Sequence, residues 1–236
     1  MQRKGISKAN VAYECVRDMI VSYKLAPGTQ LSDYKLSQEL AMSRSSIRDA
    51  ILRLETDGLV RISDANKVIV SPVGLDDVLD ILTVRCAVET QAIKLIARGG
   101  WLDRKIEEKL AGILREFRGI HWGMDFVSQH RLDDEFHRTI VREAGSPRLN
   151  EIFETASLQM QRARWLDMTD SHRQEQLADE HEAILSSLKG HDLERCLESY
   201  EAHLQSCADS YVAALASEQM QELAKMISNF FSDSNA

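Results

Sequence analysis

Three histidines and one aspartate occupy positions where an apolar helical face, and hence a core, is expected. Asp133 and His137 are four residues apart, so on a helix they are neighbours, and their face also carries Phe136. His181 and His203 stand on the apolar faces of two later helical stretches. Polar groups in a core need partners, and one divalent cation would satisfy three imidazoles and a carboxylate together. The pattern therefore indicates a candidate metal site.

The same four residues have a plainer interpretation. An inward-facing histidine is more often a hydrogen-bonded core residue than a metal ligand, and on the residues alone this alternative stays open. A catalytic metal is a further alternative, because a six-coordinate ion would keep two positions free for substrate. Four protein ligands suit a sensing site or a purely structural site better, since catalytic sites keep a coordination position open.

A second charged group stands on the apolar face expected for residues 76–98. Arg85 and Glu89 are four residues apart there, close to Leu82. A buried ion pair that braces the helices is one interpretation. The other is that Arg85 binds the carboxylate of an effector whose remaining oxygens reach the metal. Arg164 is a second candidate for this effector contact.

A third candidate site lies at residues 41–60, AMSRSSIRDAILRLETDGLV. Ser43 provides an N-cap hydroxyl, and apolar residues recur behind it at helical spacing. This apolar set is Ile47, Ala50, Ile51 and Leu54. Arg44, Ser45 and Arg48 share a sector outside that face. Arginine is the best bidentate reader of guanine, and a helix in the major groove contacts bases with its first turns. The stretch fits a DNA-recognition helix, and taken alone it also fits an ordinary amphipathic helix.

The residues around this stretch follow the order of a winged helix-turn-helix domain. Residues 8–24 and 33–40 are expected to form two helices, separated by the turn signal Pro27-Gly28. After the third helix, the β-rich pieces GLVRIS and KVIVS predict a hairpin with Asn66 near its tip. The segment SPVGL, residues 71–75, predicts a short hinge.

The rest of the chain is expected to form an antiparallel bundle of six helices, or of seven with residues 217–231. Glycines and a proline separate the helical stretches by short loops. The six stretches are 76–98, 103–118, 125–143, 147–166, 172–189 and 192–215. The fold class is therefore mainly α, with a winged helix-turn-helix of three helices and a hairpin joined to this bundle.

Charge is unevenly distributed along the 236 residues. The net charge is −8, yet residues 1–70 hold 11 Lys and Arg against 8 Asp and Glu, whereas residues 71–236 hold 18 against 29. A basic front on an acidic body suits a local DNA-binding module attached to a unit that does not touch DNA. The four cysteines form no CxxC motif, which predicts buried thiols and a reducing compartment. Because neither a membrane span nor a signal-peptide core is evident, we expect a cytoplasmic protein.

Over about residues 8–70 the sequence resembles the GntR family of bacterial transcription regulators. The matching residues are Leu25-Ala26-Pro27-Gly28, Leu31, Leu36, Leu40, Ser43 to Ala50, Leu54-Glu55 and Asp57 to Val60. The resemblance implies that Arg44 and Arg48 read bases and that Ser45 and Ser46 contact the DNA backbone or bases. Two departures stand out: Ser46 replaces a usual proline or threonine, and Asn66-Lys67 replaces a wing glycine, so Lys67 is expected to contact phosphate only.

Residues 76–215 look like the helical effector domain, called FCD, of the FadR-type branch of that family. The matching residues are Arg85, Glu89, Asp133 to His137, Ala144 to Leu149, Glu180-His181 and His203-Leu204. In metal-binding members of the family, the positions that match Asp133, His137, His181 and His203 are the ligands. The resemblance therefore implies that all four ligands are present in this chain.

Together these features predict a metal-containing transcription regulator and not an enzyme. Residues 1–70 would bind DNA, and residues 76–236 would bind the effector and dimerise. Residues 71–75 would form the linker between these two domains. We expect a homodimer on a pseudo-palindromic operator, and repression that is released by a small organic or sugar acid. Zn is the favoured divalent ion, although Ni, Mn or Fe would also suit three imidazoles and a carboxylate.

Overall fold

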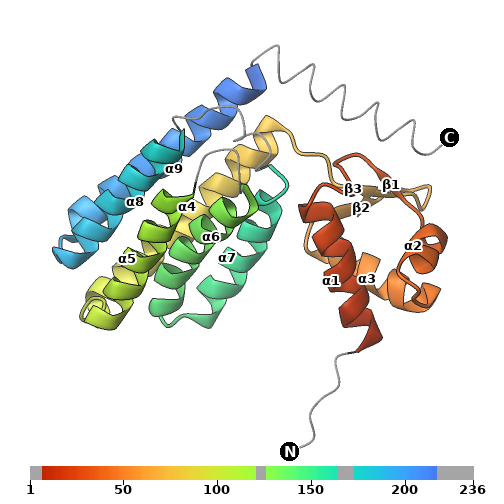
Figure 1. Cartoon of the computed structure of the whole chain (residues 1–236), viewed down its shortest axis with the longest axis horizontal. Coiled ribbons are helices and arrows are strands. Elements are labelled where there is room, and N and C mark those ends of the chain that lie inside the picture. The colour runs from red at the N-terminus through yellow and green to blue at the C-terminus, as the bar shows by residue number, and fades with distance from the viewer. Residues whose placement is uncertain (1–6, 121–125, 164–172, 217–236) are drawn as a thin grey trace, which may run out of the picture. The chain divides into compact units, whose positions relative to one another are not determined.

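The computed structural model describes residues 7–120, 126–163 and 173–216. The chain forms two compact units, and the boundary between them falls between Gly74 and Leu75. Helices predominate in both, and within the described residues the strands belong to the N-terminal unit (Figure 1). The predicted fold class is confirmed: a winged helix-turn-helix is followed by a helical bundle.

Within the described residues, the N-terminal unit combines three helices with a small sheet. The helices are α1 (Lys8–Val21), α2 (Asp33–Glu39) and α3 (Arg44–Thr56), and the strands are β1 (Gln30–Leu31), β2 (Val60–Ile62) and β3 (Val68–Val70). Strands β2 and β3 are the predicted hairpin. Strand β1 was not predicted, because two residues are too short to show a strand period. It pairs antiparallel with β3, which lies in the middle of the sheet.

A serine is the N-cap of each of these three helices. The side chains of Ser7, Ser32 and Ser43 each accept a hydrogen bond from a backbone N–H three residues later. At its other end α3 stops before Gly58, whose φ of 75° is the left-handed conformation that glycine adopts without strain. Asn66 at the hairpin turn has a φ of 55°, and asparagine is among the few side chains that tolerate this conformation. Asparagine can therefore stand at the wing position where the family resemblance leads one to expect glycine.

The apolar back of α3 packs against α1. Ala12, Val16 and Ile20 of α1 and the apolar set predicted on α3 are all buried. The Tyr13 hydroxyl also donates a 2.6 Å hydrogen bond to Asp57, at the end of α3. This packing fixes which side of α3 faces solvent.

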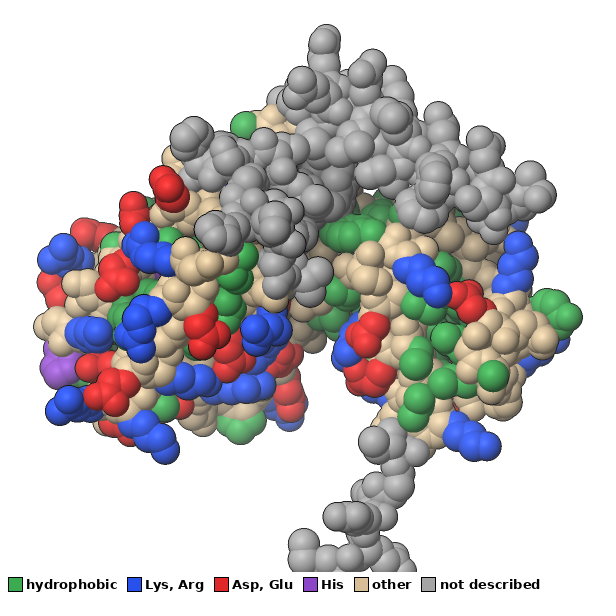
Figure 2. Space-filling view, viewed as in Figure 1, with side chains coloured by type: hydrophobic (Ala, Val, Ile, Leu, Met, Phe, Trp, Pro, Cys, Tyr) green, Lys and Arg blue, Asp and Glu red, His purple; other side chains and the backbone are tan. Residues whose placement is uncertain are grey.

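The C-terminal unit is a bundle of six helices within the described residues. They are α4 (Leu75–Gly99), α5 (Arg104–Gly119), α6 (Phe126–Glu143), α7 (Pro147–Met160), α8 (Arg173–Lys189) and α9 (Leu193–Ala216). Helix α4 packs against α6, α7 and α9, while α5 packs against α6 and α8. On the face shown in Figure 2, basic and acidic side chains are interspersed over this unit, without a continuous basic patch.

Two predicted helices were too long. The expected helix 8–24 ends at Val21. The expected helix 147–166 ends at Met160, where Arg162 and Ala163 donate backbone hydrogen bonds to residues only three positions earlier and close a tight turn. Arg164 and the last expected helix, 217–231, lie outside the described residues. Among the described helices, none has the length and apolar character needed to cross a membrane.

Candidate metal centre and nucleic-acid interface

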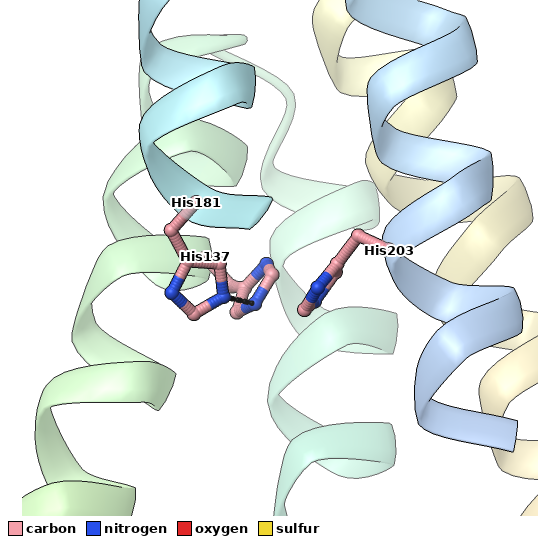
Figure 3. Close-up of side chains that lie close together, drawn as sticks. All are labelled: His137, His181 and His203. Atoms are coloured by element: carbon pink, nitrogen blue, oxygen red, sulfur yellow. Dashed lines mark hydrogen bonds between the residues drawn. The ribbon is translucent and has the colours of Figure 1, made fainter. Parts of the chain in front are cut away.

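Three histidines converge inside the C-terminal unit from three different helices. His137 comes from α6, His181 from α8 and His203 from α9, and Figure 3 shows their rings turned toward one another. His137 and His181 are fully buried and His203 is only 2% exposed. One ligand atom of each lies within 4.8 Å of those of the other two. The structure therefore brings together the three predicted imidazole ligands.

The separation of the imidazole nitrogens fits a shared metal ion. Nε2 of His137 lies 3.2 Å from Nε2 of His181. Two nitrogens bound tetrahedrally to one Zn²⁺ at about 2.0–2.1 Å would stand about 3.3 Å apart. The donor set of borderline nitrogen ligands suits the same class of ion. The residues present thus fit a divalent metal.

Asp133 lies beside two of these three histidines. Its Oδ1 is 3.5 Å from His181 Nε2 and 3.8 Å from His137 Nε2, so the carboxylate stands at the edge of the cluster. The next residue, Asp134, is more deeply buried and accepts hydrogen bonds from Ser157 and Gln161 instead. Of the two adjacent carboxylates, Asp133 is the one placed beside the imidazoles.

Polar groups behind His137 orient its ring. Nδ1 lies 2.5 Å from the Tyr200 hydroxyl and 2.9 Å from Oε2 of Glu89, the latter at ion-pair distance although out of hydrogen-bond alignment. A carboxylate only accepts, so this pairing favours the tautomer with its proton on Nδ1. Nε2 then keeps its lone pair for a metal.

A carboxylate also stands behind His203. Oε2 of Glu180 lies 2.7 Å from Nδ1 of His203, and its other oxygen accepts hydrogen bonds from Arg173 and Ser206. Burial alone would raise the pKa of Glu180, but the hydrogen bonds from His203 and Ser206 bring it below its ordinary value. The third ring differs, because Nδ1 of His181 is buried without a hydrogen-bond partner.

Two of the buried imidazoles, those of His181 and His203, are in the neutral form that binds metals. Burial lowers the pKa of His181 well below its ordinary value, and the neighbouring His203 and His137 lower it further. Burial also lowers the pKa of His203, although its hydrogen bond to Glu180 acts in the opposite direction. Both rings are therefore neutral at pH 7, with a lone pair available.

Arg85 and Glu89 form the expected buried ion pair within α4. Nε of Arg85 donates to Oε1 of Glu89 at 2.7 Å, and both side chains are almost completely enclosed. Burial by itself would raise the pKa of Glu89, but the charge of Arg85 and the neighbouring His137 imidazole lower it below its ordinary value. Nη2 of Arg85 is buried without a hydrogen-bond partner, so one donor of this guanidinium is left for another acceptor.

A second possible ligand group, formed by Glu180, His203 and Cys207, has a different character. The guanidinium of Arg173 donates to Glu180 at 2.9 Å and contacts Sγ of Cys207 at 3.1 Å. The positive charge of Arg173 already lies beside Glu180 and Cys207, and it would repel a metal cation at the same place. The three-histidine cluster is therefore the better metal site.

On the N-terminal unit, the predicted DNA-contacting residues lie along α3 and the hairpin. Arg44, Ser45, Arg48 and Lys67 are exposed. Ser46 differs, because its side chain is buried and its hydroxyl lies 2.9 Å from that of Ser43 at the helix cap. This hydrogen bond ties Ser46 to the first turn of α3.

Both arginines of α3 contact one acidic residue of α2. Arg44 donates through Nη2 to both oxygens of Asp33 at 3.0 Å, and Arg48 donates through Nε to Oδ2 at 2.6 Å. Slight burial would raise the pKa of Asp33, but the hydrogen bonds from Arg48 and Arg44 lower it below its ordinary value. The two cations therefore share one ionised carboxylate.

Sequence reasoning missed several residues that complete these sites. Tyr200 was not among the predicted site residues, and Glu180 was predicted only as part of the FCD-like motif. Asp33 was counted only as the start of a helix. For Glu180, a carboxylate next to a histidine on an inward face was an available signal. For Tyr200 and Asp33 no local signal existed, since their partners are at least eleven residues away.

Known proteins with similar sequences are transcription regulators. The chain is 27% identical over 195 residues to an uncharacterised HTH-type transcriptional regulator, YdhC, of Bacillus subtilis, which covers 81% of this chain and 85% of that protein. It is 26% identical over 204 residues to the HTH-type transcriptional repressor RspR of Escherichia coli, covering 84% and 86%. With the Nta operon transcriptional regulator of Aminobacter aminovorans it shares 27% identity over 198 residues, covering 81% and 88%.

Solved structures show the same fold. McbR/YncC of E. coli superposes with a TM-score of 0.74 at 20% identity, covering 88% of this chain and 98% of that one. A transcriptional regulator GntR from Rhodococcus sp. RHA1 superposes with a TM-score of 0.72 at 19% identity, covering 88% and 98%.

Two family models together match most of the described chain. Residues 8–70 match the gntR family of bacterial regulatory proteins, and residues 80–206 match the FCD domain. The similar proteins are named as transcription regulators, so the metalloenzyme alternative is set aside. The chain belongs to the gntR family of DNA-binding transcription regulators, in the branch that carries an FCD domain.

Proposed function

We propose that this regulator senses a small organic or sugar acid through a divalent metal held in its C-terminal unit. The observation that carries the proposal is the convergence of three buried imidazoles, with two Nε2 atoms 3.2 Å apart. In this proposal residues 1–70 bind DNA, residues 71–75 act as the linker, and residues 76–236 bind effector and dimerise. An effector that favours one arrangement of the linked units would change operator affinity.

His137, His181, His203 and Asp133 would hold the metal. Zn is the favoured ion, since neutral imidazole nitrogens and a carboxylate suit it, while Ni, Mn and Fe are accepted by the same donors. When bound, the ion supplies a positive centre that attracts a carboxylate oxygen. Glu89 and Tyr200 favour the His137 tautomer that carries its proton on Nδ1, and Glu180 favours the same tautomer of His203, so Nε2 of each ring would keep its lone pair for the metal.

Arg85 would bind the effector. Its Nη2 donor is buried and has no hydrogen-bond partner, and a buried donor without an acceptor is costly. An effector carboxylate would satisfy it with a charge-assisted hydrogen bond. Arg164, outside the described residues, remains the second predicted effector contact.

Arg44 and Arg48 would read operator bases, supported by Ser45, Ser46 and Lys67. The exposed places of Arg44, Ser45 and Arg48 on α3 and of Lys67 on the hairpin, within the part that matches the gntR family, support this assignment, while Ser46 is buried at the helix cap. A homodimer would present two copies of α3 to a pseudo-palindromic operator about one helical turn apart. We propose that the protein represses transcription until the effector binds, which releases the repression. We place it in the cytoplasm, where bacterial DNA lies.

The DNA assignment is tested by binding to a duplex that the wild-type protein selects from a randomised library. We expect Arg44→Ala to weaken binding to this duplex by about 1–3 kcal/mol and to relax base choice in the contacted positions. Electrophoretic mobility shift and footprinting measure both effects. An unchanged affinity and footprint would remove Arg44 from the reading residues.

The metal assignment is tested by elemental analysis and by anomalous scattering from crystals of the purified protein. We expect about one ion per chain at the histidine cluster, and none in His181→Ala. The role of the ion is tested by titrating sugar acids and hydroxy acids into loaded and stripped protein. If stripped protein binds DNA normally, ignores every acid and only melts at lower temperature, the metal is structural.

A further inference from the structure

Asp33 occupies an unusual place for an acidic residue in a DNA-binding unit. It begins α2, directly after the N-cap Ser32, yet its carboxylate reaches the first turns of α3. There it contacts Arg44 and Arg48, the two proposed base readers, which stand on successive turns. One side chain of α2 therefore connects both readers of α3.

The two arginines use different donors in these contacts. Arg48 donates through Nε, so its terminal nitrogens Nη1 and Nη2 are not used by Asp33. Those two nitrogens form the end-on pair that can bind a guanine edge. Arg44 instead donates through Nη2 to both carboxylate oxygens, and either bidentate edge of a guanidinium includes this nitrogen. Arg48 can thus read a base while it stays hydrogen-bonded to Asp33. Arg44 first has to release at least one carboxylate oxygen of Asp33 before it can bind a base through two nitrogens.

The exposure of the cluster makes such an exchange easy. The side chains of Arg44 and Arg48 are 53% and 63% exposed, and Asp33 is 21% exposed. Ion pairs at such positions contribute little to folding, because water competes for both partners. They do restrict two long side chains to one orientation, and they place a negative charge beside both cations. That charge opposes attraction to phosphates, which carry most of the sequence-independent affinity for DNA.

We infer that Asp33 is a positioning residue that aligns Arg44 and Arg48 for base reading and weakens their attraction to DNA of other sequences. The inference rests on the proposed function, in which these arginines read the operator. It assigns to α2 a share in sequence discrimination that acts through the orientation of Arg44 and Arg48 on α3.

The test compares Asp33→Ala with wild type on two duplexes, the library-selected one and a scrambled one, over a series of salt concentrations. We expect the ratio of the two affinities to fall by about tenfold or more, with tighter binding to scrambled DNA. The salt dependence on scrambled DNA should steepen by about one unit of log affinity per log salt, as released arginines move to phosphates. Asp33→Glu should restore most of the discrimination.

Asp49→Ala is the matched control. It removes one negative charge from α3 itself, at an exposed residue for which no contact with either arginine is seen. If it lowers the ratio as much as Asp33→Ala, total charge explains the effect and the inference is wrong. If Asp33→Ala does not fold, Asp33→Asn, which keeps the shape of the side chain, replaces it in the test.

The failure of this inference and that of the proposed function are distinguishable. If Arg44→Ala and Arg48→Ala both lose affinity for the selected duplex while Asp33→Ala keeps the wild-type ratio, the arginines read DNA without help from Asp33. If the arginine variants bind both duplexes like wild type, the assignment of base readers itself is wrong.

Discussion

Two groups of charged side chains, one in each unit, use similar residues for opposite purposes. Glu89 in the helical bundle lies between Arg85 and His137, and its side chain is fully buried. Asp33 in the winged helix lies between Arg44 and Arg48, whose side chains are more than half exposed. A buried charge must keep its partners, while an exposed one can exchange them for a ligand. The first arrangement suits a fixed binding site and the second suits recognition of DNA.

Removal of one partner from the buried group should have the largest effect. We expect Glu89→Ala to destabilise the protein by about 3–5 kcal/mol, because Arg85 would remain buried without its counter-charge. Urea unfolding followed by tryptophan fluorescence reports on this unit, since Trp101, Trp122 and Trp165 all follow residue 75. The double variant Arg85→Met, Glu89→Leu should recover most of the loss. A loss below about 1 kcal/mol in Glu89→Ala would mean that water reaches this pair.

Metal removal should have the next largest effect. An ion present at a hundredfold excess over its Kd stabilises the folded state by about 2.7 kcal/mol. We therefore expect chelator-treated protein to melt at a lower temperature and added Zn²⁺ to reverse the change. His181→Ala should lose this response to Zn²⁺. Differential scanning calorimetry measures it, and an equal response in wild type and His181→Ala would place the ion elsewhere.

The hydrogen bond behind His203 should have a smaller effect on metal affinity. Glu180→Gln keeps the size of the side chain but replaces the charged acceptor at His203 Nδ1. Loss of such an outer partner costs about 10–100-fold in metal affinity. A chelator competition assay measures this value. Glu182→Gln, at an exposed position of the same helix, is the control and should bind metal like wild type.

The exposed group should have the smallest effect on stability. Asp33→Asn should cost about 0–1 kcal/mol, because an exposed ion pair contributes little. The pKa of Asp33 is lowered in the folded state, so its contribution is present above the unfolded pKa of about 4 and is lost as the pH falls through the lower folded value. Hydrogen exchange of α2 and α3 should therefore differ between variant and wild type at pH 6, and this difference should vanish under strong acid. A difference that persists in acid would have another cause.

Much of the local structure could be predicted because its causes lie within a few residues. Ser43 was expected to cap α3 and does, and the helix ends just before Gly58, a residue type that favours the left-handed conformation found there. Helix α7 was predicted too long, since no glycine or proline marks its end at Met160. The end is set by backbone hydrogen bonds of residues 161–163, which leave no sign in the apolar pattern.

The candidate site could be predicted in part. Helical periodicity placed His137, His181 and His203 inward, and all three are buried. It placed Asp133 on the same face as His137, where the structure has it beside the imidazoles. The hydrogen-bond partners behind the rings were not foreseen, because Tyr200 acts on a residue 63 positions earlier in the chain.

The sequence by itself determined most of the elements of this protein, the inward direction of His137, His181 and His203 and the outward direction of Arg44 and Arg48. Caps, turn residues and apolar spacing act over a single helix, so they can be followed along the chain. Only the tertiary structure decided which inward and outward groups meet. Contacts such as His137 with His181, or Asp33 with Arg48, depend on the register and crossing of separate helices, which spacing within each helix leaves undetermined.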